Sequence, residues 1–287
     1  MTGILLTGAT GFVGRQVVGA LADSGTKITA VVRKGAAVPA GLHHVIETDD
    51  IFSHTASQWA EMCSRIDSIV HLAWYAEPGK YLHSPLNLSC LAGTVRLAEG
   101  AVMAGVKRFV GVGTCFEYAL GDDILTTDGR LGPTTPYGAA KAAAWYGLSQ
   151  YFPSTQTEFA WCRLFYLYGA GEDDRRLIPY LHACMRSGLP AQLTSGNQVR
   201  DFMNVGEAGH QIARVGLGEG SGALNICSGI PVTVGEIALS IARRYGRPEL
   251  VRLGAKADRA DDPSFVVGQP SLTPKISESL DAISVPY

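Results

Sequence analysis

The stretch Thr7-Gly8-Ala9-Thr10-Gly11-Phe12-Val13-Gly14 decides the fold. It follows a short apolar run, Ile4-Leu5-Leu6, and leads into an amphipathic segment, which predicts a strand, a glycine-rich turn and a helix. Gly8 allows the tight turn, Gly11 lets a pyrophosphate approach the backbone, and Gly14 lets the helix pack on the strand. The N–H groups at the helix start would hold the phosphates, so the stretch predicts a dinucleotide site; a glycine-rich turn without a ligand is the alternative.

Size and composition describe an ordinary globular chain. It has 287 residues, enough for one large domain or two modest ones, of which 46% are hydrophobic and 17% charged. The net charge of −2 gives no electrostatic reason to expect nucleic acid or an anionic membrane as partner. No apolar run reaches membrane-spanning length, and the six cysteines and seven histidines show no metal-ligand spacing. We therefore expect a cytoplasmic protein with reduced thiols, no metal site, no membrane partner and no nucleic-acid partner.

Two cations follow the second expected strand, residues 27–32: Arg33 and Lys34. In an NAD site, an acidic side chain near this point binds the adenosine ribose, whereas cations suit the 2′-phosphate of NADP. We therefore favour NADP(H), with NAD(H) as the alternative; solvated surface cations are the other interpretation. Asp49, at the end of the third strand, would meet the adenine amino group or cap a helix.

Strands and helices alternate along the first part of the chain. Apolar runs at 68–73 and 107–113 predict buried strands, and 55–65 and 86–104 predict helices. This alternation predicts an α/β fold with a Rossmann-type, doubly wound parallel sheet. The aromatic loop 74–85 follows a strand end, where open α/β sheets bind ligands.

The helix–strand periodicity weakens from Pro179 onward, where short segments mix with prolines. We expect a dinucleotide-binding Rossmann domain formed by residues 1–176 with about 205–228. A smaller mixed α/β substrate-binding domain would comprise residues 177–204 with about 229–287. The substrate should bind between the two domains.

Tyr137 and Lys141 are four residues apart at the start of an expected helix, so they share one helix face. A free tyrosine has a pKa of about 10, and a nearby ammonium lowers that pKa. Thr114, at a strand end, offers a hydroxyl to the same substrate oxygen, and Lys141 can also hold a nicotinamide ribose. Together the three side chains would transfer a proton beside a hydride carrier. An ordinary helix surface is the alternative for the Tyr-x-x-x-Lys pattern alone.

Taken in order, these motifs resemble the extended short-chain dehydrogenase/reductase family, particularly nucleotide-sugar epimerases, dehydratases and ketoreductases. The resemblance covers nearly the whole chain and continues through His71-Leu72-Ala73, Arg163 to Gly169, Arg200-Asp201-Phe202 and Asn225 to Gly229. It implies that Thr114, Tyr137 and Lys141 are catalytic and that the protein forms a homodimer. The cofactor-binding residues that it implies are Gly8, Gly11, Phe12, Val13, Leu72, Ala73, Tyr137 and Lys141.

The family pattern also implies a nucleotide-diphosphate sugar as substrate, with Arg200 and Arg259 at the diphosphate. The planar fork of an arginine binds phosphate oxygens bidentately; a surface ion pair is the alternative for Arg259. Tyr166 stands where many relatives have an Asn that contacts the substrate. Trp74 is bulkier than the usual small residue and would shape the sugar pocket or serve packing.

The residues after Thr114 bear on the reaction. Sugar-nucleotide 4,6-dehydratases have Asp and Glu there, which supply the acid and base for water elimination, but this chain has Cys115 and Phe116. Dehydration is therefore disfavoured, and these two side chains would line the substrate site.

We expect a reductase that uses NADPH to deliver hydride to C4 of a nucleotide-linked 4-keto-6-deoxy sugar, with Tyr137 as the proton donor. The cations after the second strand, the missing dehydratase carboxylates and a short C-terminal domain favour this reaction. The alternative is an NAD-dependent nucleotide-sugar 4-epimerase, which needs the same three side chains. A more distant alternative is a non-catalytic regulator that senses dinucleotides, which would not need a Tyr–Lys pair.

Overall fold

The large sheet of the computed structural model, which describes residues 3–274 and 283, has seven parallel strands in the order β10-β6-β5-β4-β1-β2-β3. These strands are β1 (Gly3–Thr7), β2 (Lys27–Arg33), β3 (His44–Thr48), β4 (Ser68–His71), β5 (Arg108–Thr114), β6 (Glu158–Leu164) and β10 (Gly222–Ile226). From β1 the chain first adds β2 and β3 on one side and then crosses to β4 on the other. The predicted doubly wound sheet is confirmed, and its switch point lies between β1 and β4, the place where such sheets bind ligands.

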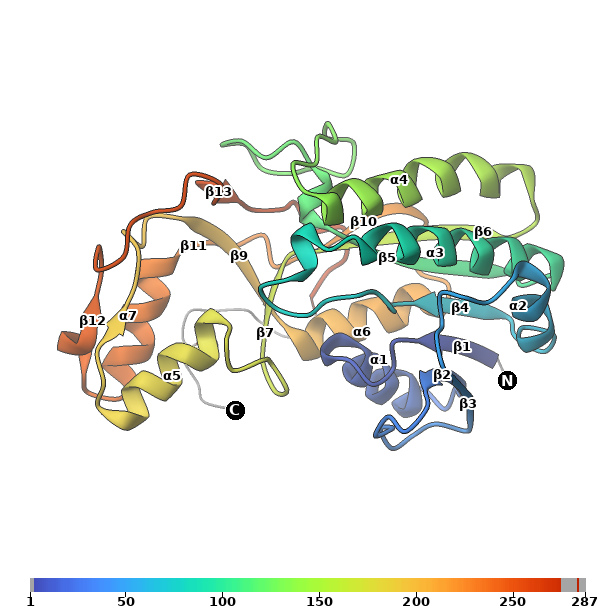
Figure 1. Ribbon diagram of the computed structural model, residues 1–287, viewed down its shortest axis with the longest axis horizontal. Coiled ribbons are helices and arrows are strands. Elements are labelled where there is room, and N and C mark those ends of the chain that lie inside the picture. The colour runs from blue at the N-terminus through green and yellow to red at the C-terminus, as the bar shows by residue number, and fades with distance from the viewer. Residues whose placement is uncertain (1–2, 275–282, 284–287) are drawn as a thin grey trace.

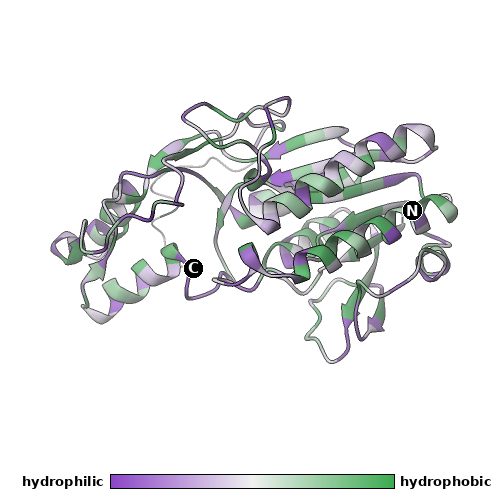
Figure 2. Cartoon of the chain, turned by 45° about the horizontal axis from the view of Figure 1, so that its top comes forward, coloured by the Kyte–Doolittle hydropathy of each residue, from purple (hydrophilic) through white to green (hydrophobic). Residues whose placement is uncertain are grey.

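Helices cover both faces of this sheet (Figure 1). One face carries α1 (Phe12–Asp23) and α6 (Val205–Gly216), and the other carries α2 (Ala56–Met62), α3 (Leu86–Met103) and α4 (Pro136–Tyr151). Along β1, Ile4 and Leu6 belong to the core on the first face and Leu5 to the core on the second. A parallel strand that is buried on both faces reads as a continuous apolar run, and Figure 2 shows such apolar stretches along the central strands.

A smaller α/β unit lies at the other end of the molecule (Figure 1). Its strands are β7 (Tyr166–Tyr168), β8 (Ala191–Gln192), β9 (Val199–Asn204), β11 (Pro231–Thr233), β12 (Val251–Arg252) and β13 (Phe265–Val266), and its helices are α5 (Leu177–Ser187) and α7 (Val234–Arg244). The first half of β9 pairs with β11 and β13, and its second half pairs with β7 beside the Rossmann sheet. Strand β9 thus links the small unit to the large sheet. Part of the predicted substrate domain, residues 275–282 and 284–287, lies outside the described residues.

Four single-turn 3₁₀ helices complete the elements of the described residues: η1 (Tyr81–His83), η2 (Cys115–Glu117), η3 (Phe152–Ser154) and η4 (Pro248–Leu250). Two predicted elements are shorter than expected. Helix α2 begins after Thr55, which caps the helix because its side chain accepts the N–H of Gln58. The helix ends at Met62. Strand β4 ends at His71, where the chain turns beside the glycine-rich loop.

All six cysteines are buried and free, as expected for reduced thiols that fill the core. No helix in the described part of the chain is long and apolar enough to cross a membrane.

Candidate active site

The glycine-rich turn joins β1 to α1. Gly8 has a φ of 77°, and a Cβ on Gly14 would lie 2.0 Å from the carbonyl oxygen of Gly8, so the turn and the close packing both require glycine. Gly11 is the N-cap of α1 and has no side chain with which to cap the helix, whose first turn carries no acidic residue. The first N–H groups of α1 therefore need an acceptor from elsewhere, and an anion such as a pyrophosphate fits them.

Two substitutions separate the roles of these glycines. A Cβ on Gly11 would touch only the carbonyl oxygen of Gly8, at 3.3 Å, and would stand in front of the helix start. Gly11→Ala is therefore expected to weaken dinucleotide binding at least tenfold with an unchanged melting temperature, whereas Gly14→Ala lowers the melting temperature itself. Thermal melts and fluorescence titration with NADH and NADPH measure both effects. Unchanged binding by Gly11→Ala would contradict the assignment.

His71, at the end of β4, holds the strand end against this turn. Its Nδ1 lies 2.7 Å from the Thr7 hydroxyl and its Nε2 lies 2.8 Å from the hydroxyl of Thr94, which itself donates to the carbonyl of Cys90. Nε2 therefore carries the proton, and burial lowers the pKa of His71 to about 3, so the ring is neutral. The Thr7 hydroxyl also accepts the N–H of Ala73, at 3.2 Å. This network places the predicted cofactor-lining residues beside Gly8.

Lys34 and Asp49, both predicted near the adenosine half of the cofactor, contact each other. Lys34 Nζ lies 3.0 Å from Asp49 Oδ1, and the two side chains are 62% and 83% exposed. Arg33 is also exposed, at the end of β2. An exposed ion pair contributes little stability, so Lys34 remains free to turn toward a phosphate.

The predicted catalytic residues lie together. Thr114 is the last residue of β5, and Tyr137 lies in the first turn of α4, which Thr135 caps by accepting the N–H of Gly138 at 3.2 Å. A Cβ on Gly138 would lie 2.3 Å from the carbonyl oxygen of Phe116, so glycine lets α4 approach the end of β5. In this arrangement the Thr114 side chain forms a hydrogen bond with the Tyr137 hydroxyl.

Tyr137 differs from expectation in its ionisation. Burial raises the pKa of its hydroxyl above the ordinary value, Tyr81 adds to the effect, and the hydrogen bond with Thr114 opposes it. The sequence predicted a lowered pKa, because it showed the nearby ammonium of Lys141 but not the burial. The phenol is therefore protonated at neutral pH.

Lys141 is 3% exposed, and its Nζ donates to the carbonyl of Val112 and lies 3.8 Å from the ring centroid of Trp74. Burial lowers the pKa of this lysine to about 7, while the neighbouring Glu117 and Cys90 raise it. Trp74 thus contacts the catalytic helix directly.

Sequence reasoning missed Glu117, which is fully buried behind Thr114. Its carboxylate accepts the backbone N–H of Thr114 at 2.8 Å, Trp161 Nε1–H at 3.0 Å and Arg163 Nε–H at 2.8 Å. A Cβ on Gly113 would lie 2.2 Å from Glu117 Oε1, so glycine makes room for the carboxylate. The sequence signal that could have indicated this buried carboxylate is an acidic residue between two aromatic ones, Phe116 and Tyr118, shortly after a buried strand.

Four of the predicted substrate residues form a second group: Cys115, Phe116, Tyr166 and Arg200. The ring of Tyr166 lies 6.2 Å from that of Phe116 and 5.3 Å from the guanidinium of Arg200, whose Nη2 donates to Asp262 at 2.6 Å. Cys115 is buried in the same cluster, and burial raises the pKa of its thiol to about 12, so it stays neutral. These residues come from β7, β9 and η2, which the fold brings together beside the catalytic group.

Arg259 lies apart from that group. Its side chain is 70% exposed and bonds Asp261 with both Nε, at 3.0 Å, and Nη2, at 2.8 Å. This is the surface ion pair that the sequence left open as the alternative. The same loop instead brings Asp262 to Arg200.

Asp201, also missed, fixes the loops around Arg200. Its carboxylate accepts N–H groups from Ser228 at 2.8 Å, Gly229 at 2.9 Å and Gly268 at 3.2 Å, and the hydroxyl of Ser228 at 2.6 Å. Burial raises the pKa of this carboxyl, and the four hydrogen bonds oppose that rise. Asp201 therefore ties β9 to two neighbouring loops.

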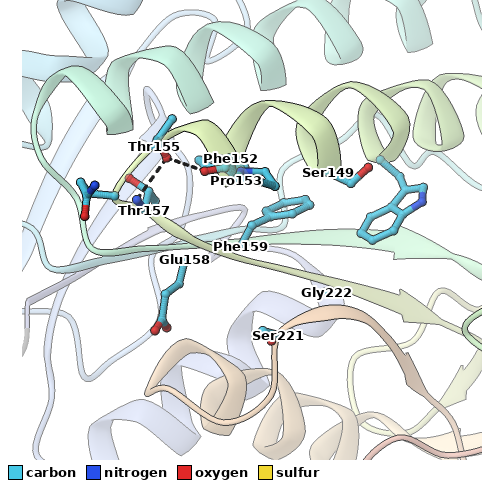
Figure 3. Close-up of a pocket in the computed structure, with 11 residues that line it drawn as sticks. Ser149, Phe152, Pro153, Thr155, Thr157, Glu158, Phe159, Ser221 and Gly222 are labelled. Carbon is cyan, nitrogen blue, oxygen red and sulfur yellow. Dashed lines mark hydrogen bonds between the residues drawn. The ribbon is translucent and has the colours of Figure 1, made fainter.

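Two open hollows lie at the amino ends of the large sheet's strands, away from these residues. One, of about 420 Å³, is lined by Trp145, Phe159 and the start of β6 (Figure 3), and the other, of about 360 Å³, by Lys107, Arg108 and their neighbours. Neither contains any of the predicted site residues. Among the described residues, no group of three or more His, Cys, Asp or Glu side chains could hold a metal ion.

Comparison with known proteins identifies the family. The model of the NAD dependent epimerase/dehydratase family matches residues 4–225. The chain belongs to this family. The resemblance inferred from the motifs is therefore confirmed, and the glycine-rich turn and the Thr–Tyr–Lys group both lie inside the matched region.

Individual members of the epimerase/dehydratase family are distant relatives. The chain is 26% identical over 234 residues to dTDP-6-deoxy-L-talose 4-dehydrogenase (NAD(+)) of Aggregatibacter actinomycetemcomitans, covering 79% of this chain and 85% of that protein. It is 24% identical over 270 residues to UDP-glucose 4-epimerase of Mycolicibacterium smegmatis, covering 85% and 83%. The structure of UDP-N-acetylglucosamine 4-epimerase from Methanobrevibacter ruminantium in complex with UDP-N-acetylmuramic acid superposes with a TM-score of 0.84 at 19% identity, over 99% of this chain and 96% of that one. That last likeness establishes the fold.

Proposed function

We propose that this protein reduces a nucleotide-linked 4-keto-6-deoxy sugar at C4, using NADPH. The protonation state of Tyr137 carries the proposal: a half-buried phenol that is protonated at neutral pH is suited to donate a proton. An epimerase must begin the other way, with the phenolate as base. Relatives that act as 4-dehydrogenases on a dTDP-6-deoxy sugar support the substrate class.

Each side chain of the site has a separate role in the proposed reduction. Bound at the β1–α1 turn, the dinucleotide supplies the hydride. Tyr137 gives its proton to the C4 oxygen, and Thr114, whose hydroxyl already bonds Tyr137, steadies that oxygen. The Lys141 ammonium favours the phenolate that remains, and Arg200 would bind the diphosphate after leaving Asp262.

The 4-epimerase remains the second candidate, because several relatives are UDP-glucose 4-epimerases. The test is to purify the protein, identify any bound dinucleotide, and follow NADPH absorbance with dTDP- and UDP-linked 4-keto-6-deoxyhexoses. A reductase consumes NADPH in proportion to the keto sugar. Tightly held NAD⁺, with interconversion of UDP-glucose and UDP-galactose and no net NADPH consumption, would instead establish the epimerase.

Arg33 and Lys34 should set the preference for NADPH. Replacing both by Ala removes charge-assisted hydrogen bonds of about 1.5–3 kcal/mol each, so we expect NADPH to bind about 10²- to 10⁴-fold more weakly, with NADH nearly unaffected. Asp49→Asn frees Lys34 from its ion pair and should strengthen NADPH binding. Fluorescence titrations at two salt concentrations measure the ratio of NADPH affinity to NADH affinity. Equal losses for both dinucleotides would contradict the preference.

A homodimer is proposed from exposed apolar residues on α3. Leu88, Val95 and Met103 are 70%, 37% and 61% exposed, and the neighbouring face of α4 exposes Ala139, Ala143 and Gly147, whose small size permits close helix packing.

Analytical ultracentrifugation should give a molecular mass of about twice the chain mass of 30.4 kDa. Leu88→Glu should yield monomers, whereas Leu189→Glu, at a similarly exposed leucine of the small unit, should not. A monomeric wild type would refute the interface.

Two further assignments complete the proposal. The described part of the small unit, with its own core in which α5 and α7 face each other, would serve as the substrate-binding domain at the predicted boundaries, 177–204 with about 229–287. The buried, free cysteines support a cytoplasmic location, where thiols stay reduced.

A further inference from the structure

Trp74 and Lys141 form a buried cation–aromatic contact. The Nζ of Lys141 lies 3.8 Å from the centre of the Trp74 ring, and the lysine is almost completely buried. A cation over the face of an indole is attracted by the negative charge of that face, and the attraction grows when water is excluded. The indole is therefore a partner of the ammonium in its own right, beside the carbonyl of Val112.

Asn87, which is 1% exposed, fixes the orientation of the indole. Its Nδ2 donates to the carbonyls of Tyr81 at 2.7 Å and Ser84 at 2.9 Å, so its Oδ1 must face the other way. There Oδ1 accepts Trp74 Nε1–H at 2.8 Å. An indole N–H can only donate, so this amide holds the ring with its face toward Lys141.

The same amide serves a second aromatic ring. By holding the carbonyl of Tyr81, Asn87 steadies η1, and the ring of Tyr81 packs edge-on against Tyr137 with centroids 4.8 Å apart. Trp74 packs on Tyr137 in the same manner at 6.3 Å. One buried amide thus sets two rings around the catalytic helix.

We propose that Trp74 is a positioning residue that acts through Lys141: its face, oriented by Asn87, holds the buried ammonium in place and keeps it charged. The inference rests on the proposed function, in which Lys141 must be an ammonium to favour the phenolate of Tyr137. It assigns to Trp74 a task beyond shaping the sugar pocket.

The groups around Lys141 show why such help is needed. Burial lowers the pKa of Lys141 to about 7, so near neutral pH the charged form is only marginally favoured. Glu117 of η2 raises that pKa, as does Cys90 of α3, although burial raises the thiol's own pKa and keeps it neutral. His71 of β4 is neutral, and Tyr137 on the same helix is protonated. The indole face is thus one of few features that favour the ammonium.

The test is an NMR titration of the lysine side chains labelled with ¹³C at Cε. The chain has seven lysines, and Lys141→Met identifies the signal of Lys141 by its loss. Trp74→Phe keeps an aromatic ring but weakens the cation–aromatic attraction and removes the bond to Asn87, so Lys141 should titrate about one pH unit lower. Trp59→Phe is the matched control: that buried indole has no hydrogen-bond partner for Nε1 in the structure and belongs to α2, so its loss should leave the titration unchanged.

A second readout is the pH profile of turnover. If the charged lysine is required, kcat falls as the pH rises through the pKa of Lys141, and this alkaline limb should move to lower pH in Trp74→Phe by the same amount. An unchanged Lys141 titration in Trp74→Phe would overturn the inference even in a proven reductase. Because the NMR titration needs no substrate, it stands or fails independently of the reaction: a shifted titration supports the role of Trp74 even if the keto sugar is not reduced.

Discussion

Tyr137→Phe is expected to lower turnover by about 10²- to 10⁴-fold while dinucleotide binding persists. The substitution removes the hydroxyl that donates the proton and bonds Thr114 but keeps the ring, which packs edge-on against Tyr81. The fold and the β1–α1 turn should therefore be unaffected. Steady-state rates with a keto-sugar nucleotide, together with NADPH titration of the same preparation, measure the two properties separately.

The matched control for this substitution is Tyr146→Phe. Tyr146 is on the same helix but is exposed, so the loss of its hydroxyl should change neither rate nor binding. A Tyr137→Phe enzyme with full turnover would mean that another group is the acid. A wild-type protein that binds dinucleotide but turns over no nucleotide sugar would favour the sensing regulator.

The fold was predictable because its signals are local. The turn from Gly8 to Gly14 needs glycine for reasons of backbone geometry within one strand–helix unit, and the buried strands read as apolar runs wherever they lie in the sheet. The grouping of Thr114, Tyr137 and Lys141 came from a strand end and a helix face, both of which are also local features. Family resemblance then supplied the roles.

The remainder of the site depends on contacts between distant parts of the chain. Glu117 meets Arg163 across 46 residues, and Asp201 meets Gly268 across 67, so no window of sequence shows either pair. The raised pKa of Tyr137 follows from burial, which no spacing rule contains. Arg259 matched a family motif, yet its exposed pairing with Asp261 depends on how the loop is folded.

Glu117→Gln is expected to cost about 3–5 kcal/mol of the free energy of unfolding and to lower turnover as well. Every group around the carboxylate is a donor: the N–H of Thr114 and Trp161 Nε1–H meet one oxygen, and Arg163 Nε–H meets the other. An amide places its own NH₂ against one of these donors and leaves the arginine without a counter-charge in a fully buried site. The carboxylate holds the backbone N–H of Thr114 itself. When that hydrogen bond is weakened, the Thr114 hydroxyl should lose its alignment with Tyr137.

Urea denaturation and turnover of the folded variant separate the two consequences of Glu117→Gln. Glu219→Gln is the control, since it removes a carboxylate from an exposed pair with Arg214 and should cost about 0–1 kcal/mol. Adding Arg163→Met to Glu117→Gln should recover part of the stability, because the uncompensated charge is then gone, and part of the turnover, because the amide oxygen can then accept the N–H of Thr114. If the single variant were as stable as the wild type, the carboxylate would not act as the buried counter-charge of Arg163, and the alignment of Thr114 would need another cause.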